Sequence, residues 1–378
     1  MHKYRLISKK GEGTFSEVLK AQSIKTGKFV AIKCMKTHFT SIEQVNNLRE
    51  IQALRRLSPH PHIVKLIEVI YDEPTGRLAL VFELMDLNLY EWYKGRKHPI
   101  PEAKIKSYMY QLLIALEHMH HTDIFHRDIK PENVLLADDI LKLADFGSCR
   151  GINTRQPYTE YISTRWYRPP ECLLTDGFYN FAMDNWGAGC IFFEVIALTP
   201  LFPGKNELDQ VRLIHKIMGT PSQAILDDFK KKATHMEINF SKVDGTGFSR
   251  LIPNANPQAV DLIQKLLVYN WEERISAHEA LKHPYFNELR QQEKTVRLFA
   301  VPARSESPSA DSAAGSKSKE SIYLPPIDNK KLKQIPKIQG PTYSKKNITL
   351  DQKSVISKPQ FPHWKSPYAA KHFYKSYY

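Results

Sequence analysis

Residues 126–133 read HRDIKPEN and bring six charged or polar side chains together just before the apolar run VLL. A merely solvated loop has no need of such a density of charge beside a buried strand. Within the run, Asp128 could act as a base, Lys130 could neutralise charge on a phosphate, and Asn133 could ligate a metal ion. The spacing therefore predicts a catalytic loop at the entrance to a strand.

A further acidic residue follows a second strand-like run. The segment LKLAD ends at Asp145, and Phe146-Gly147 come next. Carboxylate and amide oxygens are hard ligands that suit Mg²⁺ bound jointly with nucleotide phosphates. Asp145 and Asn133 are therefore the predicted metal ligands.

Two features near the N-terminus could hold phosphates. The run GEGTFSEV, residues 11–18, contains two glycines whose N–H groups can approach phosphate oxygens without obstruction by a Cβ. VAIK ends at Lys33, and Glu50 on the next predicted helix could pair with it. Taken alone, the glycine run is equally compatible with a hairpin turn, and Lys33 with an exposed strand lysine. The presence of all these motifs in one order favours a phosphate site.

The elements that would position these residues fall into a β-rich part and a helical part. Ser41 and Gln44 have capping-box spacing at the start of a helix predicted within the β-rich part. A cleft between two such parts is a natural ligand site. The predicted strands lie within 4–36, 63–70 and 78–84, and the predicted helices at 41–57, 104–121, 183–199 and 257–270.

Composition limits the class of protein. The chain has 378 residues, of which 42% are apolar and 25% charged, which is ordinary for a globular protein. The charged N-terminus predicts no secretory signal, and no apolar run is long enough for a membrane span. The four cysteines show no paired spacing, so a reduced intracellular protein is expected. Residues 301–378 carry +9 of the net charge of +14, which gives little reason to expect that the folded part binds nucleic acid.

The motif set resembles that of eukaryotic protein kinases over about residues 4–286. The resemblance implies an α+β, bilobal kinase fold. It places a small β-rich N-lobe at about residues 4–85 and a larger helical C-lobe at about 86–286. A basic, largely disordered tail at 287–378 would follow, because Ser, Lys and Pro dominate there without a lasting period.

The resemblance also implies roles for single residues. Asp128 would accept the proton of a Ser or Thr hydroxyl, with Lys130 beside the transferred phosphate, and Asn133 and Asp145 would bind Mg²⁺. Glu171 and Arg274 match a buried structural ion pair, and Asp184 matches an anchor of the catalytic loop. The implied ATP-binding residues are Lys10, Gly11, Glu12, Gly13, Thr14, Phe15, Ser16, Glu17, Val18, Ala31, Lys33, Glu50, Phe82 as gatekeeper, and Glu83 and Met85 through their backbone groups.

Two positions depart from the family pattern. Ser16 stands in place of the third glycine of the phosphate loop, so that loop is expected to be somewhat stiffer. Pro169 stands in place of the alanine of the APE motif, where only a local effect is expected.

The triplet Thr159-Glu160-Tyr161 before TRWYR resembles the mitogen-activated and cyclin-dependent kinase branch, which implies Ser/Thr-Pro substrates and an upstream activating kinase. A phosphate on Thr159 would add about −1.5 to −2 charge and could join three arginines that would otherwise repel one another. Tyr161 could be phosphorylated too, with Arg165 as its partner, and Arg168 would shape the pocket beside the target residue. The three arginines are Arg49, Arg127 and Arg150.

Two sequence features are missing, and this narrows the branch of the kinase family that the chain resembles. The helix sequence VNNLRE lacks a cyclin-contact pattern, and no acidic docking patch follows HPYF. With TEY and a basic tail, the chain resembles the MAK/MRK/MOK group, which implies a location in cytoplasm and nucleus and a role in cilia.

The tail sequence suggests two further hypotheses. Ser307-Pro308 and Ser366-Pro367 fit a proline-directed kinase, so autophosphorylation is one of them. The end FPHWKSPYAAKHFYKSYY interleaves aromatic and basic residues, which favours docking to an unknown partner over nucleic-acid stacking; an end without function is equally compatible.

Two functions of other classes stay open on the sequence alone. One is a pseudokinase scaffold, against which the intact Lys33, Asp128, Asn133 and Asp145 argue. The other is a nucleic-acid binder, whose isolated tail would bind RNA or DNA with a steep salt dependence.

Overall fold

The computed structural model describes residues 3–158, 164–233 and 239–299. The chain separates into two units, residues 1–304 and 305–378, and the second unit lies outside the described residues. The predicted phosphorylation sites Thr159 and Tyr161 also lie outside them, as do both Ser-Pro sites of the tail.

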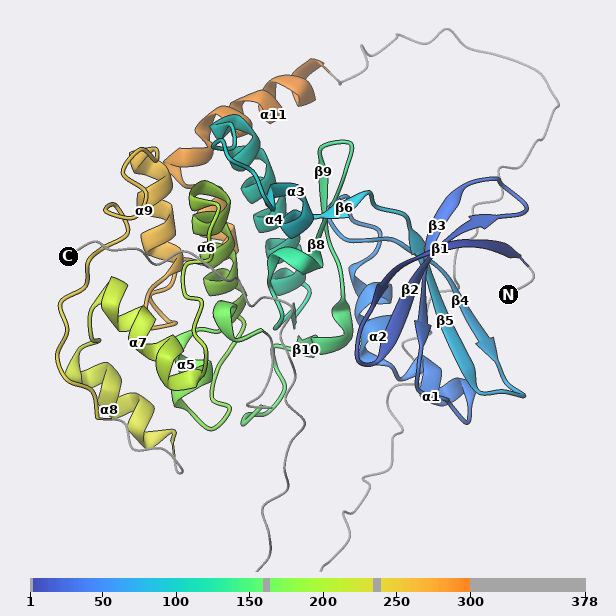
Figure 1. Ribbon diagram of the computed structural model, residues 1–378, viewed down its shortest axis with the longest axis horizontal. Coiled ribbons are helices and arrows are strands. Elements are labelled where there is room, and N and C mark those ends of the chain that lie inside the picture. Colours follow the sequence, from blue (N-terminus) through green and yellow to red (C-terminus); the bar gives the residue numbers. More distant parts are fainter. Residues whose placement is uncertain (1–2, 159–163, 234–238, 300–378) are drawn as a thin grey trace, which may run out of the picture. The chain divides into compact units, whose positions relative to one another are not determined.

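A five-stranded antiparallel sheet forms the N-terminal part (Figure 1). Along the central β3, Val30 and Ile32 are buried on one face of the sheet, so Ala31 and Lys33 point to the other face, as the alternation of a strand requires. The strands, in the spatial order β1-β2-β3-β5-β4, are β1 (Tyr4–Glu12), β2 (Ser16–Ser23), β3 (Phe29–Met35), β4 (Leu66–Asp72) and β5 (Arg77–Glu83).

The single helix predicted over 41–57 is wrong, because two helices occupy the segment. They are α1 (Ile42–Asn46) and α2 (Arg49–Leu57), and Leu48 between them is extended with φ −63° and ψ 128°. Apolar residues spaced by three do not stay on one face of a continuous helix. The interruption at Leu48 lets α1 and α2 bury different faces. Ser41 caps α1 by accepting from Gln44 N at 3.3 Å, but the Gln44 side chain accepts from Thr40 N instead of completing a capping box.

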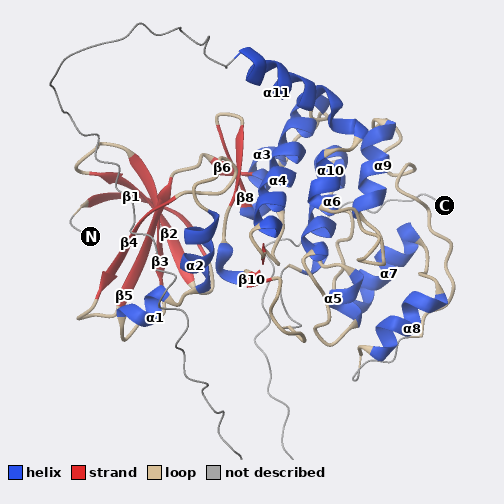
Figure 2. Cartoon of the chain, turned by 180° about the vertical axis from the view of Figure 1, so that it is seen from behind, coloured by secondary structure: helices blue, strands red, loops and turns tan. Residues whose placement is uncertain are grey.

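The C-terminal part is helical, and α6 lies at its centre against α4 and α9 (Figure 2). Its residues Ala182 to Val195 are all buried, as its almost uniformly apolar sequence predicts. The helices of this part are α3 (Leu89–Tyr93), α4 (Glu102–His121), α5 (Pro170–Leu174), α6 (Ala182–Ala197), α7 (Glu207–Met218), α8 (Gln223–Lys231), α9 (Pro257–Leu266) and α10 (Ala277–Leu281).

Short strands flank the loops that hold the predicted catalytic and metal-binding residues. The predicted strand start at Ile63 is wrong, because Ile63 makes an isolated bridge to Leu143 and β4 begins later. The short elements are β6 (Leu87–Asn88), β8 (Val134–Ala137) and β9 (Ile140–Leu143) in one sheet, β7 (Ile124–Phe125) paired with β10 (Arg150–Gly151), and the 3₁₀ turns η1 (Pro131–Asn133), η2 (Phe146–Ser148), η3 (Arg165–Tyr167) and η4 (Pro284–Phe286).

Helix α11 (Asn287–Phe299) continues the ordered chain beyond residue 286, where the predicted domain ends. Its Glu288 lies 2.7 Å from Lys106 on α4, and Tyr110 OH donates to Glu293 at 3.1 Å. The segment predicted as a largely disordered tail therefore begins with a helix that contacts α4. Within the part of the chain that the structure describes, no helix is long and apolar enough to cross a membrane.

Candidate active site

Three charged side chains from separate elements meet beside the sheet. Lys33 Nζ on β3 lies 2.8 and 2.9 Å from the two carboxylate oxygens of Glu50 on α2. It also lies 3.0 Å from Asp145 Oδ1, which follows β9. The ion pair that the sequence predicts between Lys33 and Glu50 is present.

The electrostatics of this cluster follow from burial and charge. Burial lowers the pKa of Lys33, but attraction to Glu50 and Asp145 outweighs burial and raises that pKa above its ordinary value. Burial, together with the nearby Asp145 charge, raises the pKa of Glu50. The Asp145 pKa is lowered, because Lys33 outweighs the opposing effect of burial. Two carboxylates facing one ammonium leave an excess of negative charge, which a further cation can balance.

The backbone at Asp145 aims its carboxylate. Asp145 has φ 63° and ψ 73°, the left-handed conformation that a non-glycine residue adopts at some cost. Phe146 then turns inward, is fully buried, and packs edge-on against His126 at 5.4 Å between ring centres. The Asp145 carboxylate stays half-exposed, so it remains accessible to a ligand.

The Asp128 carboxylate lies within the catalytic loop and is held by three neighbours. Asn133 Nδ2 donates to Asp128 Oδ2 at 2.9 Å and to its backbone carbonyl at 2.8 Å. Lys130 Nζ lies 2.8 Å from Oδ2, and Thr164 N donates to Oδ1 at 3.4 Å. Because the Asn133 amide nitrogen makes both of these bonds, its Oδ1 is the atom free to act as a metal ligand.

A buried aspartate fixes the backbone of this loop. Asp184 on α6 accepts from the N–H groups of His126 and Arg127, both at 2.8 Å. Its Oδ2 also lies 3.0 Å from His120 Nε2 on α4. Arg127 has φ 69°, so the loop holds a strained conformation that these bonds stabilise. This is the anchor that the sequence resemblance implies for Asp184.

The glycine run is the hairpin that joins β1 to β2. Gly13 N donates to Ser16 O at 2.8 Å, and a Cβ added at Gly11 would meet nothing within 4 Å. Thr14 and Phe15 at its tip are exposed. Open backbone at the tip fits a loop that covers phosphates.

Charged residues of the same hairpin point elsewhere. Glu12 pairs with Lys36 at 2.7 Å and with Lys9 at 2.5 Å. Lys10 Nζ donates to Asp86 O at 3.3 Å, and Glu17 lies 3.7 Å from Lys9. These charged side chains therefore bond to other groups of the protein. Val18, in the same run, lies opposite Lys33 in the ladder between β2 and β3.

The predicted adenine side lies at the end of β5. Phe82 is buried and opposite Ala31 in the β3–β5 ladder, and Met85 is also buried. Glu83 N donates to Lys65 O at 3.1 Å. Because this N–H is already bonded, the backbone group with which Glu83 would contact adenine is its carbonyl. The Glu83 side chain accepts from Lys142 Nζ at 2.8 Å and is turned to that neighbour.

The three predicted phosphate-binding arginines come close enough to affect one another. The pKa of Arg49 is lowered by burial and then by the positive charges of Arg150 and Arg127. Arg127 is engaged, since it donates from Nε to Ser148 O at 2.6 Å and from Nη1 to Tyr179 OH at 3.0 Å. Arg150 Nε is buried and has no acceptor among the residues that the structure describes. The three guanidinium groups therefore bring positive charge together at this place.

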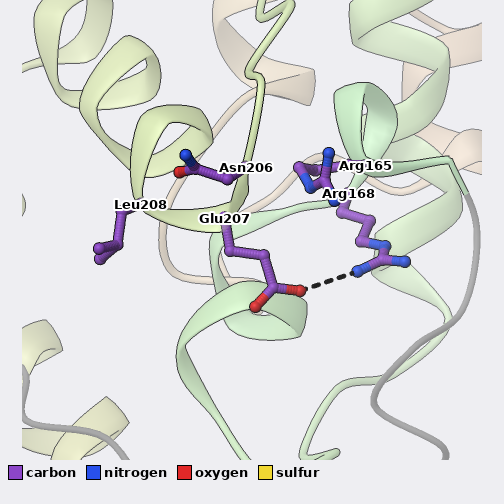
Figure 3. Close-up of a pocket in the computed structure, with 5 residues that line it drawn as sticks. All are labelled: Arg165, Arg168, Asn206, Glu207 and Leu208. Carbon is purple, nitrogen blue, oxygen red and sulfur yellow. Dashed lines mark hydrogen bonds and ion pairs between the residues drawn. The ribbon is translucent and has the colours of Figure 1, made fainter. Parts of the chain in front are cut away.

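A second positive site lies farther along the same segment (Figure 3). Arg168 points at Glu207, with 3.3 Å between Nη1 and Oε1, while Arg165 Nη1 donates to Lys205 O at 3.2 Å. Arg165, Arg168 and Glu207 line a cavity of about 350 Å³ together with Asn206 and Leu208 at the start of α7. Arg168, which the resemblance assigns to the pocket beside the target residue, lines this cavity.

The buried ion pair expected from the sequence is present. Arg274 donates to both carboxylate oxygens of Glu171, at 2.7 and 2.9 Å, and both side chains are fully buried. It also donates to Val268 O and Ala182 O, so its donors are paired with acceptors from three segments. This bidentate pair ties α5 to the segment before α10.

The donor set fits Mg²⁺ bound with a nucleotide. Within the described residues, no group of three or more His, Cys, Asp or Glu side chains could hold a metal alone. The half-exposed carboxylate of Asp145 and the Asn133 Oδ1 supply hard oxygen ligands, and Mg²⁺ commonly completes its shell with phosphate and water oxygens. The excess negative charge around Lys33 agrees with this ligand set.

Sequence reasoning missed two groups. Thr164 donates its N–H to Asp128 and accepts from Lys130 Nζ at 3.2 Å through its hydroxyl. Glu194 binds two tyrosine hydroxyls deep in the helical part. The sequence shows Thr164 only as part of TRWYR and Glu194 only as the acidic residue of an apolar helix, and neither signal identifies a partner.

Comparison with known proteins agrees with this geometry. The protein kinase domain family matches residues 4–286. The human protein named MAPK/MAK/MRK overlapping kinase is 52% identical over 354 residues, covering 91% of this chain and 82% of the human one. Its mouse counterpart is 54% identical over 332 residues, covering 85% and 79%. The rat serine/threonine-protein kinase ICK is 42% identical over 287 residues, covering 76% and 45%. The chain therefore belongs to the protein kinase family, as a protein Ser/Thr kinase of the MAK/ICK/MOK type.

Proposed function

We propose that this kinase transfers the γ-phosphoryl group of ATP to a Ser or Thr hydroxyl that precedes Pro, and that it needs Mg²⁺. The observation that carries this proposal is the Asp128 carboxylate, held by Asn133 Nδ2 at 2.9 Å and by Lys130 Nζ at 2.8 Å. A base fixed in this way can accept a proton from a hydroxyl placed next to it. Arg168 in the adjoining cavity supports the preference for Pro after the target residue.

The roles of the residues follow from their positions. The substrate oxygen forms a bond to the γ-phosphorus, the bond from that phosphorus to the β,γ-bridging oxygen breaks, and Asp128 accepts the hydroxyl proton. Lys130 places positive charge beside the transferred group, and Lys33, held by Glu50, positions the remaining phosphates. Asp145 and Asn133 would hold Mg²⁺, which when bound neutralises charge on the phosphate oxygens.

We also propose that phosphorylation of Thr159 activates the enzyme. Arg49, Arg127 and Arg150 lie on α2, the catalytic loop and β10. One phosphate accepting from all three would relieve their repulsion and fix these elements relative to each other. An upstream kinase would supply that phosphate, and a location in cytoplasm, nucleus or cilium is proposed from the resemblance alone.

The first test is a phosphate-transfer assay with the full-length chain phosphorylated at Thr159. We expect transfer to a Ser-Pro peptide, less to the matched Ser-Ala peptide, and none after chelation of Mg²⁺. Because Asp128→Asn keeps the shape but cannot accept the proton, we expect its kcat to fall by roughly 10²–10⁴-fold with ATP binding retained. A wild-type chain that binds ATP but transfers no phosphate would instead favour a scaffold.

A further inference from the structure

The segment that joins α3 to α4 presents an excess of positive charge. Residues 94–106 contain five Lys or Arg and one Glu. Two of these cations are paired, Lys104 with Asp139 at 2.5 Å and Lys106 with Glu288 at 2.7 Å. The other three are exposed, and no carboxylate oxygen of the described residues lies within 4 Å of them. They form a cationic loop and are Lys94, Arg96 and Lys97.

A tight turn fixes the backbone of this cationic loop. Lys94 has φ −52° and ψ 128°, and Gly95 has φ 74°. Arg96 N donates to Tyr93 O at 3.1 Å, which closes a type II turn with glycine at the position that requires a positive φ. Arg96 Nε also donates to Trp92 O at 2.9 Å. The loop is therefore ordered before a partner binds, and this reduces the entropy that binding costs.

Two of the three cations rest on aromatic rings of α3. Arg96 Cζ lies 4.6 Å from the centre of the Trp92 ring, and Lys94 Nζ lies 5.2 Å from the centre of the Tyr90 ring. Trp92 in turn packs edge-on against Tyr108 of α4 at 5.1 Å between ring centres. A cation–π contact holds a charged group in place without neutralising it. The rings therefore keep positive charge at the surface, where it can meet an anion.

The surroundings of the loop favour a protein partner over nucleic acid or a membrane. Single-stranded nucleic acid stacks its bases on open aromatic faces, whereas Tyr90 and Trp92 are only partly exposed and already carry Lys94 and Arg96. A membrane-binding surface combines basic with exposed apolar side chains. Residues 89–106 contain none of the large apolar side chains that the described part of the chain exposes. Carboxylates of a protein need only the exposed donors.

We propose that the cationic loop binds an acidic segment of a partner protein. Asp or Glu carboxylates of that segment would accept from Lys94, Arg96 and Lys97. Helix α3, which carries the loop at its end, packs against η1 of the catalytic loop. The inference goes beyond the transfer reaction proposed above and does not depend on it, because it concerns binding alone.

The experiment measures fluorescence anisotropy of a labelled peptide rich in Glu as the full-length chain is added. The control probe is the same peptide with Gln in place of each Glu. We expect the wild type to bind the Glu peptide, more weakly as salt is added, and not to bind the Gln peptide.

A triple variant removes the charge of the loop. Because each exposed charge pair contributes modestly, we expect the chain with Lys94→Gln, Arg96→Gln and Lys97→Gln to bind the Glu peptide about ten-fold more weakly than the wild type. Lys97→Glu is a second variant, should the triple variant not fold. Lys97 makes no hydrogen bond or ion pair with a described residue, so the fold does not depend on it. This single change should weaken binding by about three-fold.

A matched variant changes the net charge equally at another exposed surface. It carries Arg5→Gln, Lys25→Gln and Lys28→Gln, in β1 and in the turn between β2 and β3. One Arg and two Lys are replaced in both triple variants, so the two chains differ only in where the charge is lost. We expect this control to weaken binding less than about two-fold.

Four outcomes would overturn the inference. A wild type that does not distinguish the Glu peptide from the Gln peptide has no site for carboxylates. Equal affinity of the wild type and the loop variants would place the probe elsewhere, and equal losses in both triple variants would show that only net charge matters. Labelled single-stranded RNA that loses affinity in the loop variants as the Glu peptide does would show that the loop binds polyanions in general.

Discussion

At the scale of single residues, charge and burial are matched to function. Lys33 faces two carboxylates, and the one that stays half-exposed, Asp145, is the one predicted to bind Mg²⁺. Glu50 is buried and holds Lys33. The division of exposure between two otherwise similar acids indicates which acid meets a ligand and which positions a neighbour.

Glu194 also predicts a pH dependence of stability. Its folded-state pKa of about 7 lies above the ordinary 4.5, so its burial costs nothing below about pH 4.5 and progressively more as the pH rises through 7. The free energy of unfolding of Glu194→Gln relative to wild type should therefore increase by up to about 3 kcal/mol between pH 5 and 8. Urea unfolding of both chains at several pH values measures this difference, and a difference independent of pH would contradict it.

At the scale of elements, short segments depend on partners far away in the sequence. Helix α5 has only five residues and cannot be stable by itself. Its Glu171 is held by Arg274, about a hundred positions later, in a pair with no exposed surface. The position of the segment before α5, which carries Thr164 and Arg168, depends on this connection.

Removal of one member of the Glu171–Arg274 ion pair should therefore lower the stability of the fold. Glu171→Gln leaves the Arg274 charge buried without its carboxylate, and we expect a loss of about 3–5 kcal/mol in the free energy of unfolding. Asp227→Asn is the control, because Asp227 and Lys230 are about half-exposed and 3.9 Å apart, and should cost less than about 1 kcal/mol. Chemical denaturation compares the two, and equal losses would show that burial does not govern the effect.

At the scale of the whole molecule, the folded part extends beyond the family match. Helix α11 follows residue 286 and packs on α4 through Glu288 and Glu293. Arg290 donates to Leu281 O and His283 O at 2.6 and 2.9 Å, which ties the helix to the end of α10. We infer that α11 stabilises the helical part.

Two truncated chains isolate this effect. Chains that end at residues 299 and 286 differ only in α11, since both lack the tail. We expect the free energy of unfolding of the shorter chain to be about 1–3 kcal/mol lower, because this chain lacks the charged contacts of α11 to α4 and α10. Equal stability of the two chains would mean that α11 contributes nothing.

Much of the site could be predicted because the motifs are local. The runs HRDIKPEN, DFG and VAIK each place their residues on a loop or strand whose nature the flanking apolar pattern indicates. The split of α1 from α2 could not be predicted, because it depends on which face each half buries against the rest of the chain. Activation through Thr159, the Ser-Pro preference and the cellular location stay predictions.

The sequence by itself determined the family, the order of a β-rich part before a helical one, and the residues predicted to carry the chemistry, because motif spacing and hydrophobic periodicity are properties of short stretches. Only the tertiary structure decided that Thr164 touches Asp128, that two tyrosines close on Glu194, and that Glu83 turns its side chain to Lys142. Such contacts join residues from 27 to 101 positions apart along the chain. They are fixed by how buried elements pack together, and no local pattern records that packing.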